Sequence, residues 1–347
     1  MTSAVTSEQP VKLSKKDFDP GIDVRWCPGC GDYAVLANVQ RVLPTFGKPK
    51  ENFVFISGIG CSSRFPYYLN TYGFHTIHGR APAVATGLKA ARPELEVWVV
   101  TGDGDGLSIG GNHLLHAMRR NVDIKILLFN NRVYGLTKGQ YSPTSSVGSK
   151  TKSTPLGSID QPFNPLSLAV SADASFIARV ADTDAKGLQA ILTAAHEHNG
   201  TAFVEILQNC PVFNDGTFAD ITDRKVKADR QLWLEHGKPM RFGSDKKQGI
   251  VRRDGRLEAV SLDSPDVRED DVVLHDAQST DPTLAFELSQ FAWPERPVPT
   301  GIIRAVDRPA YDTALNAQIE HAREQQGRGS LHSLLHAADV WTVPEVG

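Results

Sequence analysis

Short apolar runs alternate with amphipathic segments over the first two-thirds of the 347-residue chain. Runs that are rich in β-branched and aromatic residues and precede turn residues are typical of buried strands. Such runs lie at residues 53–57, 96–102, 124–131 and 203–208. Apolar residues at helical spacing lie around and between them, at 32–43, 112–121 and 182–200. Strands that alternate with helices predict an α/β fold, with a mostly parallel sheet and helices on both of its faces.

Two parts of the chain depart from this pattern. Residues 139–165 are rich in Ser, Thr, Gly and Pro and are too long for an ordinary connection, so they predict a functional lid or a disordered loop. Beyond about residue 225 the alternation weakens. We therefore expect a polar N-terminal arm at 1–20, a main domain at 21–225, and a C-terminal extension at 226–347 that forms a subunit interface or caps the site.

Composition and charge exclude several classes of protein. Hydrophobic residues make up 40% of the chain, which is too many for a mainly disordered protein. The 37 Lys and Arg and 40 Asp and Glu leave a formal charge of −3, which does not favour binding to nucleic acid. No apolar run reaches the roughly 20 residues that span a membrane, and the N-terminus lacks the apolar segment of a secretory signal. We expect a cytoplasmic protein with neither a nucleic-acid nor a membrane partner.

The four cysteines of the chain are placed where their side chains could meet. Cys27 and Cys30 form a Cys-Pro-Gly-Cys turn, Cys61 follows the first predicted strand, and Cys210 follows the last. Loops after the carboxyl ends of parallel strands converge on one crevice. Four thiolates suit either structural zinc or an iron–sulfur cluster. The alternative is that Cys61 and Cys210 are small buried residues and that the Cys-Pro-Gly-Cys turn is a redox dithiol.

A glycine-rich turn follows the second predicted strand. Asp103 lies in the segment Thr-Gly-Asp-Gly-Asp-Gly, and Asn131 lies one strand–helix–strand crossover further along, at the end of the next strand. A carboxylate and an amide oxygen at this position suit Mg²⁺, which prefers oxygen ligands and bridges to phosphates. The glycines would let the backbone approach a pyrophosphate. The alternative for Asp105 is a charge at the start of a helix with no ligand role.

These motifs together resemble a known family. The GDG and NN segments are similar to the thiamine pyrophosphate motif. The segments CPGCGD, GIGCSSR, HTIHGRAPAVATGLK, FNNRVYGLTKGQYSPTS and NCPVFN, spread over residues 20 to 250, resemble the β subunit of 2-oxoacid:ferredoxin oxidoreductases. The form GIGCSSR is most similar to the branch that acts on 2-oxoglutarate or on a broad range of 2-oxoacids.

The resemblance implies a thiamine-pyrophosphate-binding fold and an oxidoreductase with three cofactors: thiamine pyrophosphate, Mg²⁺ and one [4Fe–4S] cluster. The implied reaction converts 2-oxoglutarate, CoA and oxidised ferredoxin to succinyl-CoA, CO₂ and reduced ferredoxin. The chain resembles only the pyrophosphate-binding half of the enzyme. An α subunit is therefore expected to supply the pyrimidine-binding half and its activating glutamate, in a dimer of αβ pairs.

The resemblance also assigns roles to individual residues. The implied cluster ligands are Cys27, Cys30, Cys61 and Cys210. The implied Mg²⁺ ligands are Asp103, Asn131 and the carbonyl of Val133. The implied cofactor-binding residues are Ile59, Gly60, Ser62, His78, Gly102, Gly104, Asp105, Leu136 and Thr137.

The distal carboxylate of 2-oxoglutarate requires a cation, for which we predict Arg64 and Lys138. For Arg64 the alternative is a salt bridge across the subunit interface. Three other functions stay open at this point. They are a pyruvate or broad-specificity enzyme of the same family, a non-oxidative thiamine decarboxylase with structural zinc, and a non-catalytic scaffold with a four-cysteine metal site.

Overall fold

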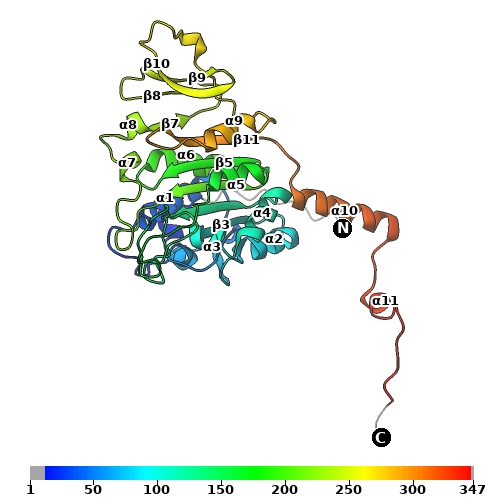
Figure 1. Cartoon of the computed structure of the whole chain (residues 1–347). Coiled ribbons are helices and arrows are strands. Elements are labelled where there is room, and N and C mark those ends of the chain that lie inside the picture. The colour runs from blue at the N-terminus through cyan, green and yellow to red at the C-terminus, as the bar shows by residue number, and fades with distance from the viewer. Residues whose placement is uncertain (1–11, 345–347) are drawn as a thin grey trace.

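An eight-stranded sheet organises residues 12–344, which are the residues that this computed structural model describes (Figure 1). The strand order is β2 (Tyr72–His75), β1 (Phe53–Ser57), β3 (Glu96–Gly102), β4 (Lys125–Asn130), β6 (Ala202–Leu207), β5 (Phe176–Ala181), β11 (Val298–Ala305) and β7 (Gln231–Leu234). Neighbouring strands are parallel except for β11 and β5, which are antiparallel. The prediction of a mostly parallel α/β sheet is confirmed.

Helices cover both faces of this sheet. One face packs against α1 (Asp32–Val42) and α6 (Ala185–Glu197). The other packs against α2 (Ala81–Ala91), α4 (Gly111–Arg120), α5 (Pro165–Ser171) and α9 (Thr283–Ser289). Every residue of β1, β4, β5 and β6 is buried, because strands between two helical layers face apolar side chains on both sides.

The predicted elements lie within a few residues of those observed, but four strands of the sheet were missed. The strand β2 lies at the sheet edge and has only four exposed residues, two of them aromatic, so its apolar run is too short to be recognised as a strand. The strand β11 begins Val-Pro-Thr-Gly, a sequence typical of a turn, and Pro in a strand argues against a central position. The strands β5 and β7 are short runs whose polar residues hide their pattern.

The sheet continues past residue 225, where we predict the main domain to end. Strands β7 and β11 both come from the segment 226–347 and extend the main sheet beyond β5. The same segment forms a small antiparallel sheet of β10 (Arg256–Ser261), β9 (Gln248–Arg253) and β8 (Arg241–Phe242), which projects at the top of Figure 1. The start of the predicted extension is therefore integral to the core, whereas residues 1–11 of the predicted arm and 345–347 lie outside the described residues.

Short helices complete the described chain. They are α3 (Asp103–Leu107), α7 (Ala219–Thr222), α8 (Lys227–Arg230) and α11 (Leu331–Leu335), with 3₁₀ turns that include η4 (Ser62–Tyr68). The remaining helix, α10 (Tyr311–Gln326), is longer, with 16 residues. None of the helices among residues 12–344 combines the length and the apolarity needed to cross a bilayer.

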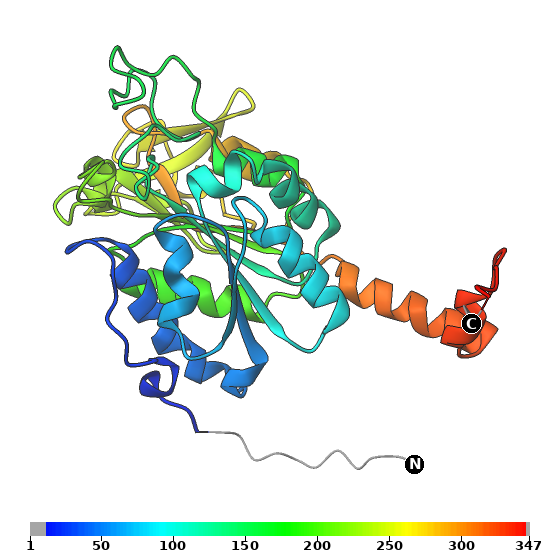
Figure 2. The same ribbon diagram turned by 90° about the horizontal axis from the view of Figure 1, so that it is seen from below.

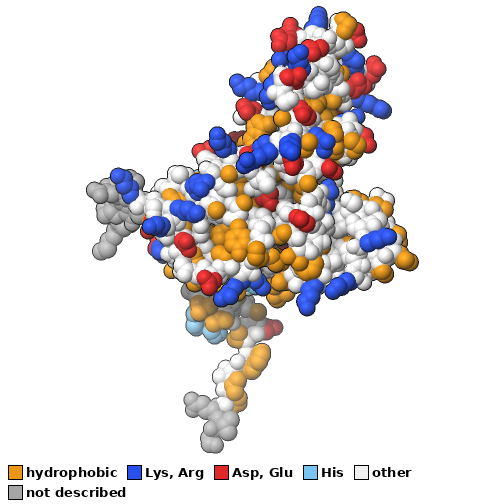
Figure 3. Space-filling model, turned by 90° about the vertical axis from the view of Figure 1, so that its left-hand side faces the viewer, with side chains coloured by type: hydrophobic (Ala, Val, Ile, Leu, Met, Phe, Trp, Pro, Cys, Tyr) orange, Lys and Arg blue, Asp and Glu red, His pale blue; other side chains and the backbone are white. Residues whose placement is uncertain are grey.

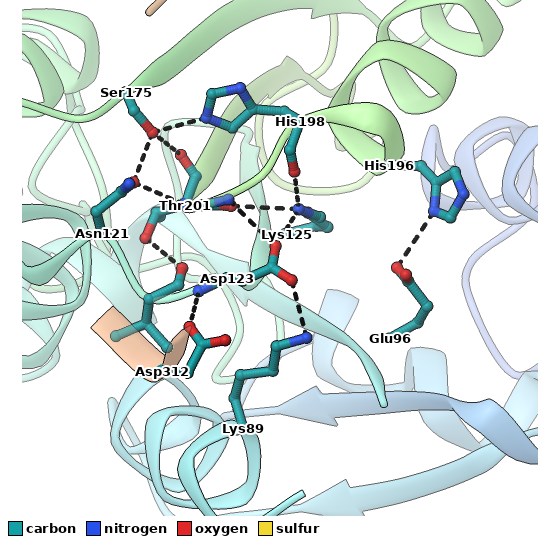
Figure 4. A network of polar contacts seen from close by, with 12 residues as sticks. Lys89, Glu96, Asn121, Asp123, Lys125, Ser175, His196, His198, Thr201 and Asp312 are labelled. Carbon is teal, nitrogen blue, oxygen red and sulfur yellow. Dashed lines mark hydrogen bonds and ion pairs between the residues drawn. The ribbon is translucent and has the colours of Figure 1, made fainter. Parts of the chain in front are cut away.

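A buried polar network fixes the start of α10 to the amino ends of the strands (Figure 4). Asp123 pairs with Lys125 at 2.6 Å and with Lys89 at 2.8 Å, and its backbone N–H donates to Asp312 of α10 at 2.9 Å. Burial would raise the pKa of Asp123, but the two lysines lower it to about 2. Burial, followed by the charge of Lys125, lowers the pKa of His198 in the same network to about 4. Asp123, which is ionised at neutral pH, therefore links Lys89 and Lys125 to the start of α10.

Beyond this anchor, α10 and the residues after it leave the body of the protein (Figures 1 and 2). Apolar side chains are exposed along this arm (Figure 3): Leu331, Leu334, Leu335, Val340, Trp341 and Val343. Exposed apolar clusters of this kind mark contacts with other molecules. The arm is thus consistent with the prediction that the C-terminal segment contacts a neighbouring subunit, which stays a prediction.

Residues 139–164 form an irregular but closely bonded loop. The N–H of Phe163 donates to the carbonyl of Pro143 at 2.8 Å, and the N–H of Gly148 donates to the carbonyl of Ser158 at 2.7 Å. Ser142, Thr144 and Ser145 within it are buried. The loop therefore covers the carboxyl edge of the sheet as an ordered layer.

Candidate active site

A cavity of about 670 Å³ opens where β1, β3 and β4 end. The turns after these strands line it, together with residues of the 133–141 segment. The residues predicted to bind cofactor or metal all lie in its wall: Ile59, Gly60, Ser62, His78, Gly102, Asp103, Gly104, Asp105, Asn131, Val133, Leu136 and Thr137. The structure thus brings together residues that are up to 78 positions apart (Ile59 to Thr137). Their roles toward a ligand stay predictions.

Asp103 presents a buried carboxylate at this cavity. It is 2% exposed, and its Oδ2 accepts hydrogen bonds from Ser142 Oγ at 2.5 Å and Thr144 Oγ1 at 2.6 Å. Burial raises the pKa of Asp103, and the two hydroxyl groups oppose that rise. Both hydroxyls come from the 139–164 loop, so the loop fixes the direction of the carboxylate from behind the cavity.

Asn131 and Val133 add neutral oxygen ligands beside Asp103. Strands β3 and β4 are parallel neighbours with Gly102 opposite Phe129, so the residues that follow them meet at one edge. The side chain of Asn131 donates to Gln208 Oε1 at 2.8 Å, and this bond orients its amide. Among residues 12–344, no hydrogen bond reaches the carbonyl of Val133. One carboxylate and two neutral oxygens form a ligand set that suits a hard divalent cation.

Asp105 differs from Asp103 because the protein itself uses both of its oxygens. Its Oδ1 accepts from the N–H groups of Ile59 at 3.0 Å and Gly79 at 2.7 Å and lies 2.6 Å from His78 Nδ1, and its Oδ2 accepts from Thr101 Oγ1 at 2.6 Å. Asp105 therefore holds two turns over the cavity and fixes the ring of His78, whose Nε2 is left as the free nitrogen. This geometry favours a positioning role over direct contact with a ligand.

The four cysteines line a second, smaller cavity of about 220 Å³. Gly135 lies against it, since a Cβ at this position would stand 3.4 Å from Cys61 Sγ and 3.7 Å from Cys210 Sγ. Gln208 Nε2 donates to Cys30 Sγ at 3.3 Å. Nowhere in the described part of the chain do three His, Cys, Asp or Glu side chains gather closely enough to hold a single metal ion. The four thiols thus border one cavity, and a four-thiolate centre, either zinc or an iron–sulfur cluster, is the kind of group that such a set could hold.

Two of the four thiols and a neighbouring carboxyl group have raised pKa values. Burial, followed by the charge of Asp32, raises the pKa of Cys61 to about 11 and raises that of Cys30 further. Burial raises the pKa of Asp32 itself to about 7, and its Oδ1 is buried without a hydrogen-bond partner in the described chain. Thiols in such surroundings ionise when a metal centre replaces their protons.

Arg64 and Lys138 lie at the cysteine cavity and not in the wall of the larger one. Arg64 Nη1 donates to the carbonyl of Arg25 at 3.1 Å, and Lys138 is exposed. The two cavities share the wall residues Cys61, Asn131, Gly135 and Leu136. A group held by the cysteines would therefore lie next to a group held by Asp103, Asn131 and Val133.

Comparison with known proteins identifies the family. Residues 58–206 match the thiamine pyrophosphate enzyme family, C-terminal TPP binding domain. The chain is 54% identical over 341 residues to the 2-oxoglutarate oxidoreductase subunit KorB of Mycobacterium tuberculosis, which covers 97% of this chain and 90% of that protein. The chain belongs to the 2-oxoacid:ferredoxin oxidoreductase β-subunit family. The resemblance given by its motifs is thereby confirmed, and so is its thiamine-pyrophosphate-binding fold.

Other β subunits of this family and a solved structure agree. The 2-oxoacid:ferredoxin oxidoreductase subunit β of Saccharolobus solfataricus is 45% identical over 203 residues, 58% of this chain and 67% of that protein. A solved structure of 2-oxoglutarate:ferredoxin oxidoreductase from Magnetococcus marinus, with 2-oxoglutarate, coenzyme A and succinyl-CoA bound, superposes with a TM-score of 0.74. The identity to that chain is 34%, and the match covers 96% of this chain and 98% of that one.

Sequence reasoning missed several residues that shape the site of this β subunit. Ser142 and Thr144 orient Asp103, and Gln208 contacts both Asn131 and Cys30. Tyr134 Oη donates to the carbonyl of Gly104 at 2.8 Å, and a Cβ on Gly104 would lie 2.3 Å from the Tyr134 ring. The run Ser-Pro-Thr-Ser-Ser at 142–146 was a usable signal, because hydroxyl side chains in a long loop can satisfy a buried carboxylate.

Proposed function

We propose that this chain is the β subunit of a CoA-dependent 2-oxoglutarate:ferredoxin oxidoreductase, which forms succinyl-CoA and CO₂ and passes electrons to ferredoxin. The proposal rests on the wall that the two cavities share. This wall places the predicted site for Mg²⁺ and diphosphate directly beside the four cysteines. The relatives support the same substrate, since the M. tuberculosis protein is a 2-oxoglutarate oxidoreductase subunit and the M. marinus enzyme binds 2-oxoglutarate and CoA.

The larger cavity would hold thiamine pyrophosphate, and Asp103, Asn131 and the Val133 carbonyl would hold the Mg²⁺ that accompanies its diphosphate. When bound, the cofactor supplies the carbon nucleophile and electron sink for decarboxylation. The chain contributes a buried carboxylate oriented by Ser142 and Thr144 and glycine turns through which the backbone approaches the diphosphate. The loop that covers the sheet edge excludes water from this side of the site.

The four cysteines hold a [4Fe–4S] cluster, which supplies one-electron transfer. The support is a set of four thiols that border one cavity and the unpartnered buried oxygen of Asp32 beside them. Cys27 is exposed, and Arg25 and Lys138 beside it are exposed cations. An acidic electron carrier such as ferredoxin would meet a complementary surface here.

The enzyme requires a partner, since the chain matches only the C-terminal thiamine pyrophosphate-binding domain type. An α subunit supplies the pyrimidine-binding half and its activating glutamate, and two αβ pairs form the assembly. A cytoplasmic location is consistent with cysteines that must stay reduced before the cluster is inserted.

A substrate comparison tests this function. The αβ complex, purified without oxygen, is given CoA and thiamine pyrophosphate, and viologen reduction is followed with 2-oxoglutarate, pyruvate or 2-oxoisovalerate. We expect the highest kcat/KM with 2-oxoglutarate. A preference for pyruvate, or equal rates with all three, would replace the 2-oxoglutarate assignment with the pyruvate or broad-specificity alternative. Absence of any CoA-dependent reduction would count against the oxidoreductase itself.

Substitution of Arg64 tests the proposed role of this cation with 2-oxoglutarate. If Arg64 pairs with the distal carboxylate, Arg64→Ala raises the KM for 2-oxoglutarate about tenfold or more and leaves the KM for ferredoxin unchanged. The same two KM values are measured for Lys138→Ala, which tests the second predicted cation. Because both residues line the cysteine cavity, the opposite pattern, an unchanged KM for 2-oxoglutarate and a raised KM for ferredoxin, would reassign them to the electron carrier.

A further inference from the structure

A third cavity, of about 350 Å³, lies at the same edge of the sheet as the two already described. It opens at the ends of β4 and β6 and is covered by residues of the 139–164 loop and by the segment after α9. Its wall shares no residue with the larger cavity. The volume is at the small end of the range for ligand sites, which begins at about 300 Å³.

The wall of this cavity contains an arginine without an anionic partner. Arg132 has a left-handed backbone, with φ of 57°, between Asn131 and Val133. Those two neighbours line the larger cavity, whereas Arg132 lines the third. Its guanidinium stacks on Phe218, 4.6 Å from the ring centroid, and no carboxylate of the described residues lies within ion-pair distance of it. The left-handed conformation thus directs the Arg132 guanidinium into the third cavity and away from Asp103, Asn131 and Val133.

A second guanidinium lies in the same wall. Arg179 is 8% exposed, and its Nε donates to Glu205 Oε2 at 2.7 Å. The other oxygen of Glu205 accepts from Asn130 Nδ2 at 2.7 Å. Hydrogen bonds within the described chain leave the two Nη groups of Arg179 unused. Glu205 pairs with Arg179, and its charge and that of Asp103 also act on Arg132 from beyond ion-pair distance. Another carboxylate of the wall, Asp220, lies 3.8 Å from Arg230. The guanidinium of Arg132 itself has no hydrogen-bond acceptor within the described chain, so it can accept an anion.

The rest of the wall is aromatic and apolar. Phe218 and Phe291 are buried, Trp293 is partly exposed, and all three border the cavity. We propose that this cavity binds a small organic anion. Its carboxylate or phosphate group pairs with Arg132 and the free Nη groups of Arg179, and its apolar part packs on the three aromatic rings. Guanidinium groups bind both kinds of anion through paired hydrogen bonds.

The site is separate from the substrate site but adjoins it. Thr144 and Asn130 border the third cavity, and the Thr144 hydroxyl lies 2.9 Å from Asn130 Oδ1 and 2.6 Å from Asp103 Oδ2. The anion would therefore bind directly behind the proposed metal ligand. Failure of the 2-oxoglutarate assignment leaves this proposal unaffected, because none of its residues lines the larger cavity.

Calorimetric titration of the intact αβ complex in phosphate-free buffer tests the proposal. The two probes are butanoate, which has a carboxylate and an apolar chain but no 2-oxo group, and inorganic phosphate, which has the anionic group alone. We expect saturable binding of one anion per β chain. Tighter binding of butanoate assigns the site to a carboxylic acid, and tighter binding of phosphate assigns it to a phosphorylated ligand.

Substitutions at Arg132 localise the binding. Arg132→Gln is expected to weaken it at least about tenfold, and Arg132→Lys, which keeps the charge, to weaken it less. Arg120→Gln, an exposed arginine at the end of α4, is the matched control and is expected to bind as the wild type does. The proposal is wrong if neither probe binds, if Arg132→Gln and Arg132→Lys both bind like the wild type, or if a structure of the complex shows a carboxylate of the α subunit on Arg132.

Discussion

Replacement of Cys210 by serine is expected to abolish electron transfer while leaving thiamine pyrophosphate bound. If four thiolates hold one cluster, loss of any of them removes iron and acid-labile sulfide together, because a hydroxyl is a poor substitute for a soft thiolate ligand. Changes to groups that merely support a metal ligand cost tenfold to a hundredfold in activity, so loss of a ligand should lower viologen reduction by about a hundredfold or more. Iron and sulfide content, the visible absorption of the complex and viologen reduction measure the effect.

Cys210 is the most informative of the four because it separates the two interpretations of the cysteines. A redox dithiol would need only Cys27 and Cys30, so Cys27→Ser would inactivate the complex and Cys210→Ser would leave it active. A cluster requires both variants to lose iron equally. Val212→Ala, at an exposed position two residues away, is the control and should keep wild-type iron content. Zinc without sulfide in the wild-type complex would favour the zinc alternatives instead.

Among the strands that are buried on both faces, the sequence predicts well those with a continuous apolar run, whereas β5, which is equally buried, was missed because Arg179 interrupts its run. Residues 53–57 and 125–130 are continuous apolar runs because helices cover both sides of them, and a continuous run is visible without any partner. The strand β11 is different. It pairs antiparallel with β5 and parallel with β7 through residues that include Pro299 and Gly301. A sequence of this kind forms a strand only because the neighbouring strands β5 and β7 pair with it.

The candidate site, like the fold, contains residues that the sequence predicts and residues that it does not. Cys61, Asp103 and Asn131 were predictable because each follows a strand, and the topology of a parallel sheet brings strand ends together. Arg64 lies close to Cys61 in the chain, but the 3₁₀ turn η4 begins at Ser62 and carries Arg64 to the wall of the cysteine cavity. The hydroxyls of Ser142 and Thr144 reach Asp103 across about 40 residues of chain, a pairing that periodicity cannot reveal.

Asp103→Asn is expected to lower the affinity for thiamine pyrophosphate by about a hundredfold while leaving the iron content unchanged. The substitution keeps the shape of the side chain but removes the charge, and Mg²⁺ binds an anionic carboxylate far more strongly than an amide. In the variant, an amide replaces the carboxylate whose Oδ2 accepts hydrogen bonds from the hydroxyls of both Ser142 and Thr144. Calorimetric titration of the αβ complex with thiamine pyrophosphate and Mg²⁺ measures the affinity, and iron analysis measures the cluster.

Asp266→Asn is the matched control, since Asp266 is an exposed loop residue that lines none of the three cavities described above. It should bind thiamine pyrophosphate like the wild type. Unchanged affinity in Asp103→Asn would remove this residue from the proposed metal site. Because the two cavities share only wall residues that neither variant changes, Asp103→Asn and Cys210→Ser should each disable one cofactor and spare the other. Loss of both cofactors in either variant would instead mean that the shared wall around Cys61 and Gly135 had collapsed, and neither assignment could then be made from activity alone.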